Sequence, residues 1–169
     1  MNAVLDEWNH ADEQSATTAM LACCGSRRWA TEMVAQRPIA NIAALSETAD
    51  RIWAGMTESD WLEAFAAHPR IGERQAPSTP EQSAEWSQQE QAGTASASAP
   101  LQRQLAEANA AYEQQFGFTC IICATGKSAE EMLATLNRRL GNDRMAELRE
   151  AAEQQRQITQ IRLGKWLLS

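Results

Sequence analysis

His68 is one of only two histidines in this chain, and its type and position suit acid–base chemistry. An imidazole can take up and release a proton near neutral pH. Pro69 follows directly, and a residue before proline is pushed out of the helical region, so a helix that reaches His68 must end there. Such an ending, with Gly72 close behind, can hold an imidazole at the edge of a cavity. The plainer alternative is a histidine that only interacts with the last carbonyls of its helix.

A second polar group follows at Ser87, Glu90 and Gln91. On a helix these three side chains project from one face, because positions three and four residues apart are neighbours. They place a hydroxyl, a carboxylate and an amide where a core helix would carry leucines. The alternative is a polar face in water. A buried Glu90 would have to be paired or protonated, which would indicate a functional role.

Four cysteines offer a different chemistry: Cys23, Cys24, Cys120 and Cys123. The last two have the C-x-x-C spacing of redox motifs, so a helical peroxidase-like enzyme is one alternative. A metal site would need a second pair of ligands, and His68 is remote in the sequence. The sequence therefore favours buried thiols over a disulfide framework or a metal site.

Two further apparent motifs fail on their spacing. Gly126-Lys127-Ser128 resembles the end of a P-loop, but the first glycine would have to stand at position 121, which is Ile. Ser87, His68 and Glu90 could form a hydrolase triad, but no glycine-flanked nucleophile elbow surrounds Ser87. Neither nucleotide binding nor acyl transfer is predicted.

The charge balance also argues against two classes of binding partner. With 15 basic and 22 acidic residues the net charge is -7, which argues against nucleic acid and anionic membrane surfaces. No apolar run approaches the length needed to span a bilayer. The first residues lack the basic and apolar regions of a signal peptide, and the last residues are not a peroxisomal address. A cytoplasmic protein is predicted.

The elements that must position these residues are helices. We expect an all-α, single-domain compact bundle of about eight to ten helices over residues 1–169. Thr57 with Asp60 and Ser128 with Glu131 are typical of helix N-termini, the second pair as a capping box. The predicted helices are Ala11–Cys24, Arg27–Gln36, Asn41–Gly55, Thr57–His68, Pro80–Gly93, Pro100–Gln115, 129–140 and Asp143–Leu168, with a loop over 72–80.

One stretch breaks the helical pattern. Residues 116–124 have a β-like composition, but no second strand is available to pair with them. We therefore expect a short, extended, buried segment near 117–124. Its backbone N–H and C=O groups must bond to something, and a polar ligand could be the partner.

Taken together, the motifs resemble those of the 2-oxo-4-hydroxy-4-carboxy-5-ureidoimidazoline (OHCU) decarboxylase family. The similarity is ordered and runs from about residue 20 to 168. One departure is Thr119-Cys120, where a bulkier side chain is expected. The matching pieces are Arg37-Pro38, His68-Pro69-Arg70-Ile71-Gly72, Ser87-x-x-Glu90-Gln91-x-Gly93, Phe116-Gly117-Phe118, Ile122-Cys123-Ala124, Gly126-Lys127-Ser128, Arg138-Arg139-Leu140 and Ile161-Arg162-Leu163.

The resemblance implies a cofactor-free and metal-free enzyme late in urate oxidation, and a homodimer. Its substrate would be OHCU, the unstable product of hydroxyisourate hydrolysis, and its products (S)-allantoin and CO2. By motif position, His68 would be the catalytic acid/base and Glu90 its carboxylate partner. The substrate-binding residues would be Pro69, Ser87, Gln91, Ile121, Ile122, Cys123 and Arg162.

Arg162 stands at the boundary of an apolar stripe, after Ile158 and Ile161. There it can bury its stem and present a planar fork to an anion, so we expect it to reach the pocket of His68 and Glu90. The alternative is an exposed salt bridge. For the whole chain, the competing prediction is a non-catalytic helical interaction module with a solvated polar face.

Overall fold

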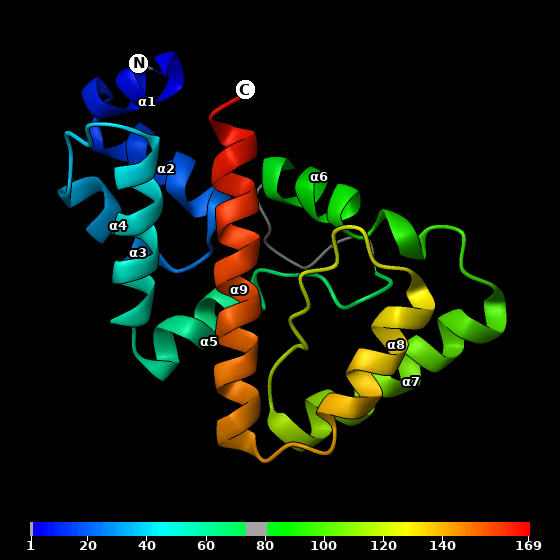
Figure 1. Ribbon diagram of the computed structural model, residues 1–169. Helices are drawn as coiled ribbons and strands as arrows, with labels where there is room; N and C mark the ends of the chain where they lie inside the picture. The colour runs from blue at the N-terminus through cyan, green and yellow to red at the C-terminus, as the bar shows by residue number, and fades with distance from the viewer. Residues whose placement is uncertain (1, 74–80) are drawn as a thin grey trace. The chain divides into compact units, whose positions relative to one another are not determined.

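A computed structural model describes residues 2–73 and 81–169 of the chain. Within these ranges it contains nine α-helices, one short 3-10 helix and no strand (Figure 1). The prediction of an all-α protein with eight to ten helices is confirmed. No helix in these ranges is long and apolar enough to cross a membrane.

The chain divides into two compact units. Unit 1 comprises Met1–Ala64 and Arg156–Ser169, and unit 2 comprises Phe65–Gln155. Both divisions fall inside helices, the first within α5 (Glu58–Ala66) and the second within α9 (Arg144–Trp166). The single domain over residues 1–169 stays a prediction.

Unit 1 contains α1 (Ala3–His10), α2 (Glu13–Cys23), α3 (Arg27–Ala35) and α4 (Ile42–Ala54), with the start of α5 and the end of α9. Each of the first four begins at a polar side chain that accepts a hydrogen bond from its first turn. The sequence prediction missed α1, because its eight residues offer only two buried side chains, Leu5 and Trp8.

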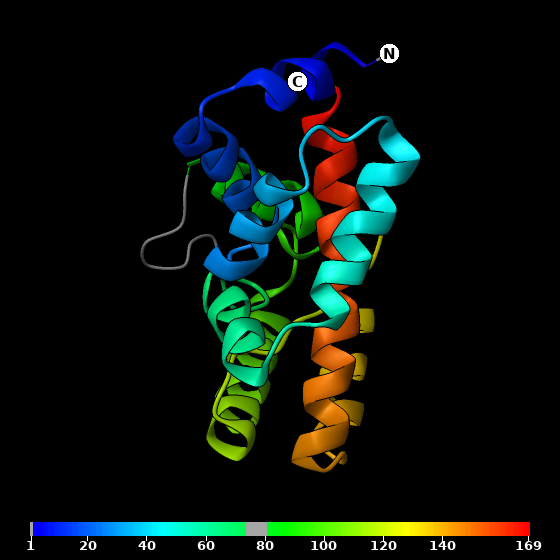
Figure 2. The same ribbon diagram turned by 90° about the vertical axis from the view of Figure 1, so that its left-hand side faces the viewer.

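Polar contacts join α4 to the end of α9. Gln160 donates its amide to Asp50 at 2.8 Å and accepts from the Ser46 hydroxyl at 2.7 Å. Figure 2 shows α4, in cyan, running beside the red end of α9. Nearby, the rings of Trp8 and Trp166 meet edge to face at 5.9 Å. This unit is therefore tied together from both ends of the chain.

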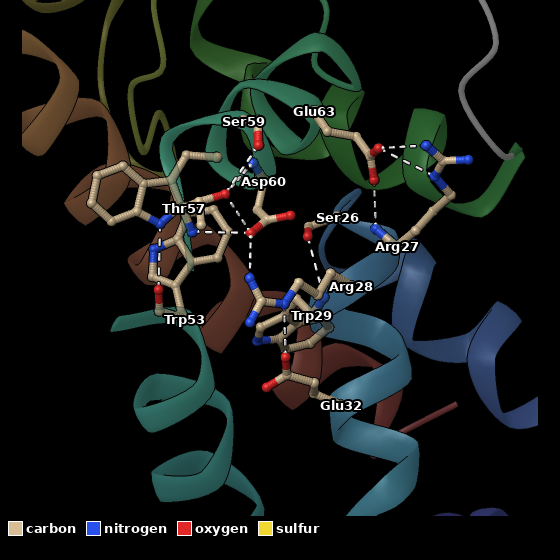
Figure 3. A network of polar contacts seen from close by, with 11 residues as sticks. Ser26, Arg27, Arg28, Trp29, Glu32, Trp53, Thr57, Ser59, Asp60 and Glu63 are labelled. Carbon is tan, nitrogen blue, oxygen red and sulfur yellow. Dashed lines mark hydrogen bonds and ion pairs between the residues drawn. The ribbon is translucent and has the colours of Figure 1, made fainter. Parts of the chain in front are cut away.

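Surface ion pairs connect the start of α3 to α5 (Figure 3). Arg28 lies 3.2 Å from Asp60, and Arg27 lies 2.9 Å from Glu63. Asp60 also accepts from the Thr57 backbone N–H at 2.9 Å, and this bond lowers the pKa of the Asp60 carboxyl. The predicted start of a helix at Thr57 is confirmed.

Unit 2 holds the remaining helices: α6 (Glu81–Glu90), η1 (Ala92–Thr94), α7 (Ala99–Phe116), α8 (Ala129–Arg139) and the first part of α9. Helices α7 and α8 pack against each other (Figure 1). The predicted capping box of Ser128 and Glu131 starts α8, and Gly117, in the left-handed conformation at φ 81°, ends α7. Pro80 and most of the predicted 72–80 loop lie outside the described residues.

The predicted extended segment is confirmed. Residues 118–124 form neither helix nor strand, and all but Thr119 are buried. In Figure 1 the segment belongs to the yellow-green trace that joins α7 to α8. The Phe118 ring packs against Phe65 at 5.5 Å and Tyr112 at 5.8 Å, so the segment is part of the core of unit 2.

A fully buried ion pair supports this segment. Arg139 and Glu147 are both 0% exposed, and Arg139 donates Nε–H to Glu147 at 2.6 Å and Nη1–H to the Ile121 carbonyl. Glu147 also accepts from the Tyr112 hydroxyl and from Asn142. Burial raises the pKa of Tyr112 above its usual value, so its hydroxyl remains a donor. The carboxylate thus meets three donors in place of water.

Replacing Arg139 by Met should lower the free energy of unfolding by about 3–5 kcal/mol, because Glu147 would stay buried without its cation. The double variant Arg139→Met, Glu147→Met should recover part of that loss. Denaturant unfolding followed by tryptophan fluorescence measures both. Arg138→Met is the matched control, because the Arg138 side chain, which pairs with Glu150, is 59% exposed. Its loss should change the free energy of unfolding by less than about 1 kcal/mol. Equal stability of Arg139→Met and Arg138→Met would contradict this account.

Candidate active site

His68 lies just beyond α5, which ends at Ala66. Its backbone N–H still bonds the Phe65 carbonyl at 3.1 Å, and buried Pro69 then turns the chain out of the helix. The half-buried imidazole is hydrogen-bonded through Nε2 to Oε1 of Gln155 at 2.6 Å. A polar partner on α9 therefore holds the ring, and the histidine is more than a cap on its own helix.

The polar face of α6 is turned inward. Ser87 is 3% exposed and Glu90 is 7% exposed, while Gln91, directly after the helix, is half-buried. Gln91 Oε1 accepts from the backbone N–H of Gly72 at 2.9 Å, which ties the end of α6 to the loop that carries His68. A solvated face, which the interaction-module alternative requires, is absent at Ser87 and Glu90.

Backbone groups of the extended segment bond to side chains of helices. Cys123 donates its N–H to Oε1 of Gln154 at 2.9 Å, and the Ile121 carbonyl accepts from Arg139. These two groups were expected to need a partner, and protein side chains provide it. Ile122, between them, is buried.

The segment also lies within electrostatic range of α6. Burial raises the pKa of the Cys123 thiol, the charge of Lys127 acts in the opposite direction, and Glu90 adds to the rise. Glu90 and Cys123 thus belong to one region of unit 2.

Neighbouring glutamines on α9 connect these parts. Gln154 binds the extended segment, and Gln155, which is 0% exposed, binds His68. Sequence reasoning missed both residues. The available signal was a glutamine within a buried stripe, because Gln155 follows Ala151 and precedes Ile158 at helical spacing.

The cysteines do not form a redox site. Cys120 and Cys123 are buried free thiols, and burial raises the pKa of Cys120 to about 12. A thiol nucleophile must ionise to react, so burial argues against the peroxidase-like alternative, and the prediction of buried thiols is confirmed. In the described ranges, no three His, Cys, Asp or Glu side chains gather as metal ligands would.

Arg162 is buried, at 3% exposure, which rules out the exposed salt bridge. Its Nη1 donates to the Ala22 carbonyl at 3.4 Å. Arg162 belongs to unit 1, whereas His68 and Glu90 belong to unit 2. Its role toward a substrate stays a prediction.

A cavity of about 500 Å³ in unit 2 lies between the loop Arg70–Glu73, Thr94 and one side of α7. Asn109 of α7 donates to the Ile71 carbonyl at 2.8 Å and so fixes this loop from the cavity side. None of the nine predicted site residues lines the cavity. The cavity therefore borders the loop that follows His68 and touches none of the predicted substrate contacts.

Comparison with known proteins gives a consistent result. The family model of OHCU decarboxylase matches residues 9–164. The uric acid degradation bifunctional protein TTL of Arabidopsis thaliana is 41% identical over 145 residues, which cover 85% of this chain and 44% of that protein. The OHCU decarboxylase of Amia calva is 44% identical over 55 residues, covering 32% of this chain and 31% of that protein. The chain thus matches less than half the length of either relative.

Solved structures share the fold. A crystal structure of OHCU decarboxylase in the presence of (S)-allantoin has a TM-score of 0.77 and 34% identity, and the match covers 94% of this chain and 100% of that one. A crystal structure of (S)-allantoin synthase, at a TM-score of 0.72 and 18% identity, covers 96% of this chain and 53% of that one. The second likeness concerns the fold alone.

Gly93 is the last residue of the Ser87–Gly93 motif, and it stands where no side chain fits. A Cβ there would lie 2.1 Å from the Lys127 carbonyl oxygen, so Gly93→Ala should lower the free energy of unfolding by about 1–3 kcal/mol through backbone displacement. Gly164→Ala is the matched control, because a Cβ at Gly164 meets nothing within 4 Å and alanine favours helix by up to about 1 kcal/mol. Thermal and urea unfolding measure both. A Gly93→Ala protein as stable as wild type would refute the close approach.

Proposed function

Because the chain belongs to the OHCU decarboxylase family, we propose that it removes CO2 from OHCU and releases (S)-allantoin. The observation that carries this proposal is the His68 imidazole, bonded at 2.6 Å to a fully buried glutamine, in the same unit as the buried carboxylate of Glu90. A half-buried histidine and a buried carboxylate are groups that acid–base chemistry on a small polar substrate can use.

Decarboxylation breaks the bond between the carboxylate carbon and the ring carbon, and the electron pair stays on the ring. The adjacent imine takes up this charge on its nitrogen, and a donor aimed at that nitrogen lowers the barrier. The imine nitrogen takes up a proton, and the hydroxyl on the decarboxylated carbon loses its proton to become the carbonyl of allantoin. One proton must then reach the neighbouring carbon, which bears the ureido group, from one side to give a single enantiomer. We assign this proton exchange to His68, with Glu90 as its carboxylate partner.

The substrate's ureido group offers both donors and acceptors. Gln91 uses its amide oxygen on Gly72, and its amide nitrogen keeps donors for a substrate oxygen. Ser87 adds a hydroxyl that can donate or accept. Pro69 and the backbone of Ile121, Ile122 and Cys123 are proposed to line the same site.

The reaction is proposed to need no metal or organic cofactor, so activity should survive exhaustive treatment with a chelator. The proposed place of action is the cytoplasm, and the proposed assembly is a homodimer, which light scattering after size exclusion tests.

The decisive experiment measures CO2 release and the chirality of allantoin from freshly generated OHCU. The wild type should accelerate CO2 release and give the (S) enantiomer, whereas uncatalysed decay protonates both faces and gives a racemate. A rate and an optical rotation equal to those without protein would overturn the proposal.

His68→Asn should fold normally and lose about 10²- to 10⁴-fold in kcat, because it lacks the group that exchanges the proton. His10→Asn is the matched control, since His10 is exposed on α1 and should leave kcat unchanged. If His68→Asn keeps more than about a tenth of wild-type activity, His68 has no part in the mechanism.

Arg162 is proposed to bind the substrate carboxylate or ureido oxygens. Arg162→Lys should raise KM about tenfold or more, because an ammonium cannot form two parallel bonds and a lost charge-assisted hydrogen bond costs about 1.5–3 kcal/mol. Stability should change little. Arg138→Lys, at an exposed position, is the control. Wild-type KM and kcat in Arg162→Lys would remove this residue from the site.

A further inference from the structure

We propose that Gln155 is a positioning residue that holds neutral His68 with its hydrogen on Nε2, so that Nδ1 is the ring atom that exchanges a proton with the substrate. The assignment of a substrate step to Nδ1 rests on the function proposed above. The tautomer itself can be measured without any substrate.

The hydrogen bond between His68 and Gln155 has a defined direction. His68 Nε2 lies 2.6 Å from Oε1 of Gln155, and an amide oxygen only accepts. Nε2 must therefore carry the hydrogen. In the neutral ring the lone pair then resides on Nδ1, because only one of the two nitrogens is protonated.

The acceptor, Gln155, is held rigidly in the core. Gln155 is 0% exposed and lies inside α9, between the buried residues Ala152 and Ile158. Water, which could donate to Nε2 as readily as accept from it, is kept away from Gln155.

The acceptor is also uncharged, because Gln155 carries an amide. A carboxylate at position 155 would also accept from Nε2, but it would favour the protonated imidazolium and raise the pKa of His68. A neutral amide fixes the tautomer and adds no full charge. Glutamine therefore suits a histidine that must change protonation state near neutral pH.

The test begins with ¹⁵N-labelled protein in the His10→Asn background, where His68 is the only histidine. Long-range ¹⁵N–¹H spectra of the neutral ring should show a single Nε2–H tautomer, with a slowly exchanging ring proton. In Gln155→Leu the ring proton should exchange freely and the Nδ1–H form should appear. Gln154→Leu, one residue away, is the matched control and should leave the tautomer of His68 unchanged.

Kinetics provide the second measurement. Gln155→Leu should reduce kcat by about 10- to 100-fold with little change in KM, as for partners that orient a histidine elsewhere. Gln155→Glu keeps an acceptor, so it should keep the tautomer, raise the pKa of His68 and shift the pH profile of kcat upward. This second variant keeps the proposal testable if the leucine variant does not fold.

Two results would overturn the inference: an Nδ1–H tautomer in the wild type, or a tautomer and ring-proton exchange that Gln155→Leu leaves unaltered. A correct tautomer in a protein that releases no CO2 would instead refute the proposed function and leave the role of Gln155 on His68 intact.

Discussion

The rest of unit 2 depends on how one buried, non-helical segment satisfies its backbone. Residues 118–124 have no strand beside them in the described part of the chain, so their N–H and C=O groups need partners other than a ladder. Arg139 serves the Ile121 carbonyl and Gln154 serves the Cys123 N–H. A buried arginine in turn requires a buried anion, and Glu147 provides it. One irregular segment thus explains why a small helical protein keeps an ion pair in its core.

The turn of α9 that holds the extended segment also holds His68. Gln154 and Gln155 are adjacent, and one holds the extended segment while the other holds His68. Gln91 fixes the loop after His68 through Gly72, so the imidazole proposed to be catalytic has support on both sides of the chain reversal. The proposed acid–base residue is therefore positioned by neutral amides, which accept hydrogen bonds without adding charge.

Features that local sequence determines were predictable. The capping pairs at Thr57 and Ser128 act within one turn of helix, and the spacing of Ser87 and Glu90 places both side chains on one helix face. The burial of that face was left open by the sequence. The roles of Gln154 and Gln155 were not predictable, because a glutamine in a helix looks the same whether it meets water or a partner many residues away. Gln155 is separated from His68 by 87 positions, and no local pattern encodes that contact. The side-chain partners of residues 121–123 were left open for the same reason.

Amide hydrogen exchange at Cys123 tests most directly whether side chains hold the segment. In the wild type the Cys123 N–H should be protected almost to the level of global unfolding, since it is bonded to Gln154 at 2.9 Å within the core. In Gln154→Leu, after correction for any change in global stability, exchange at Cys123 should accelerate about tenfold or more, while amides inside α7 keep their rates. Equal protection of Cys123 in both proteins would contradict the account.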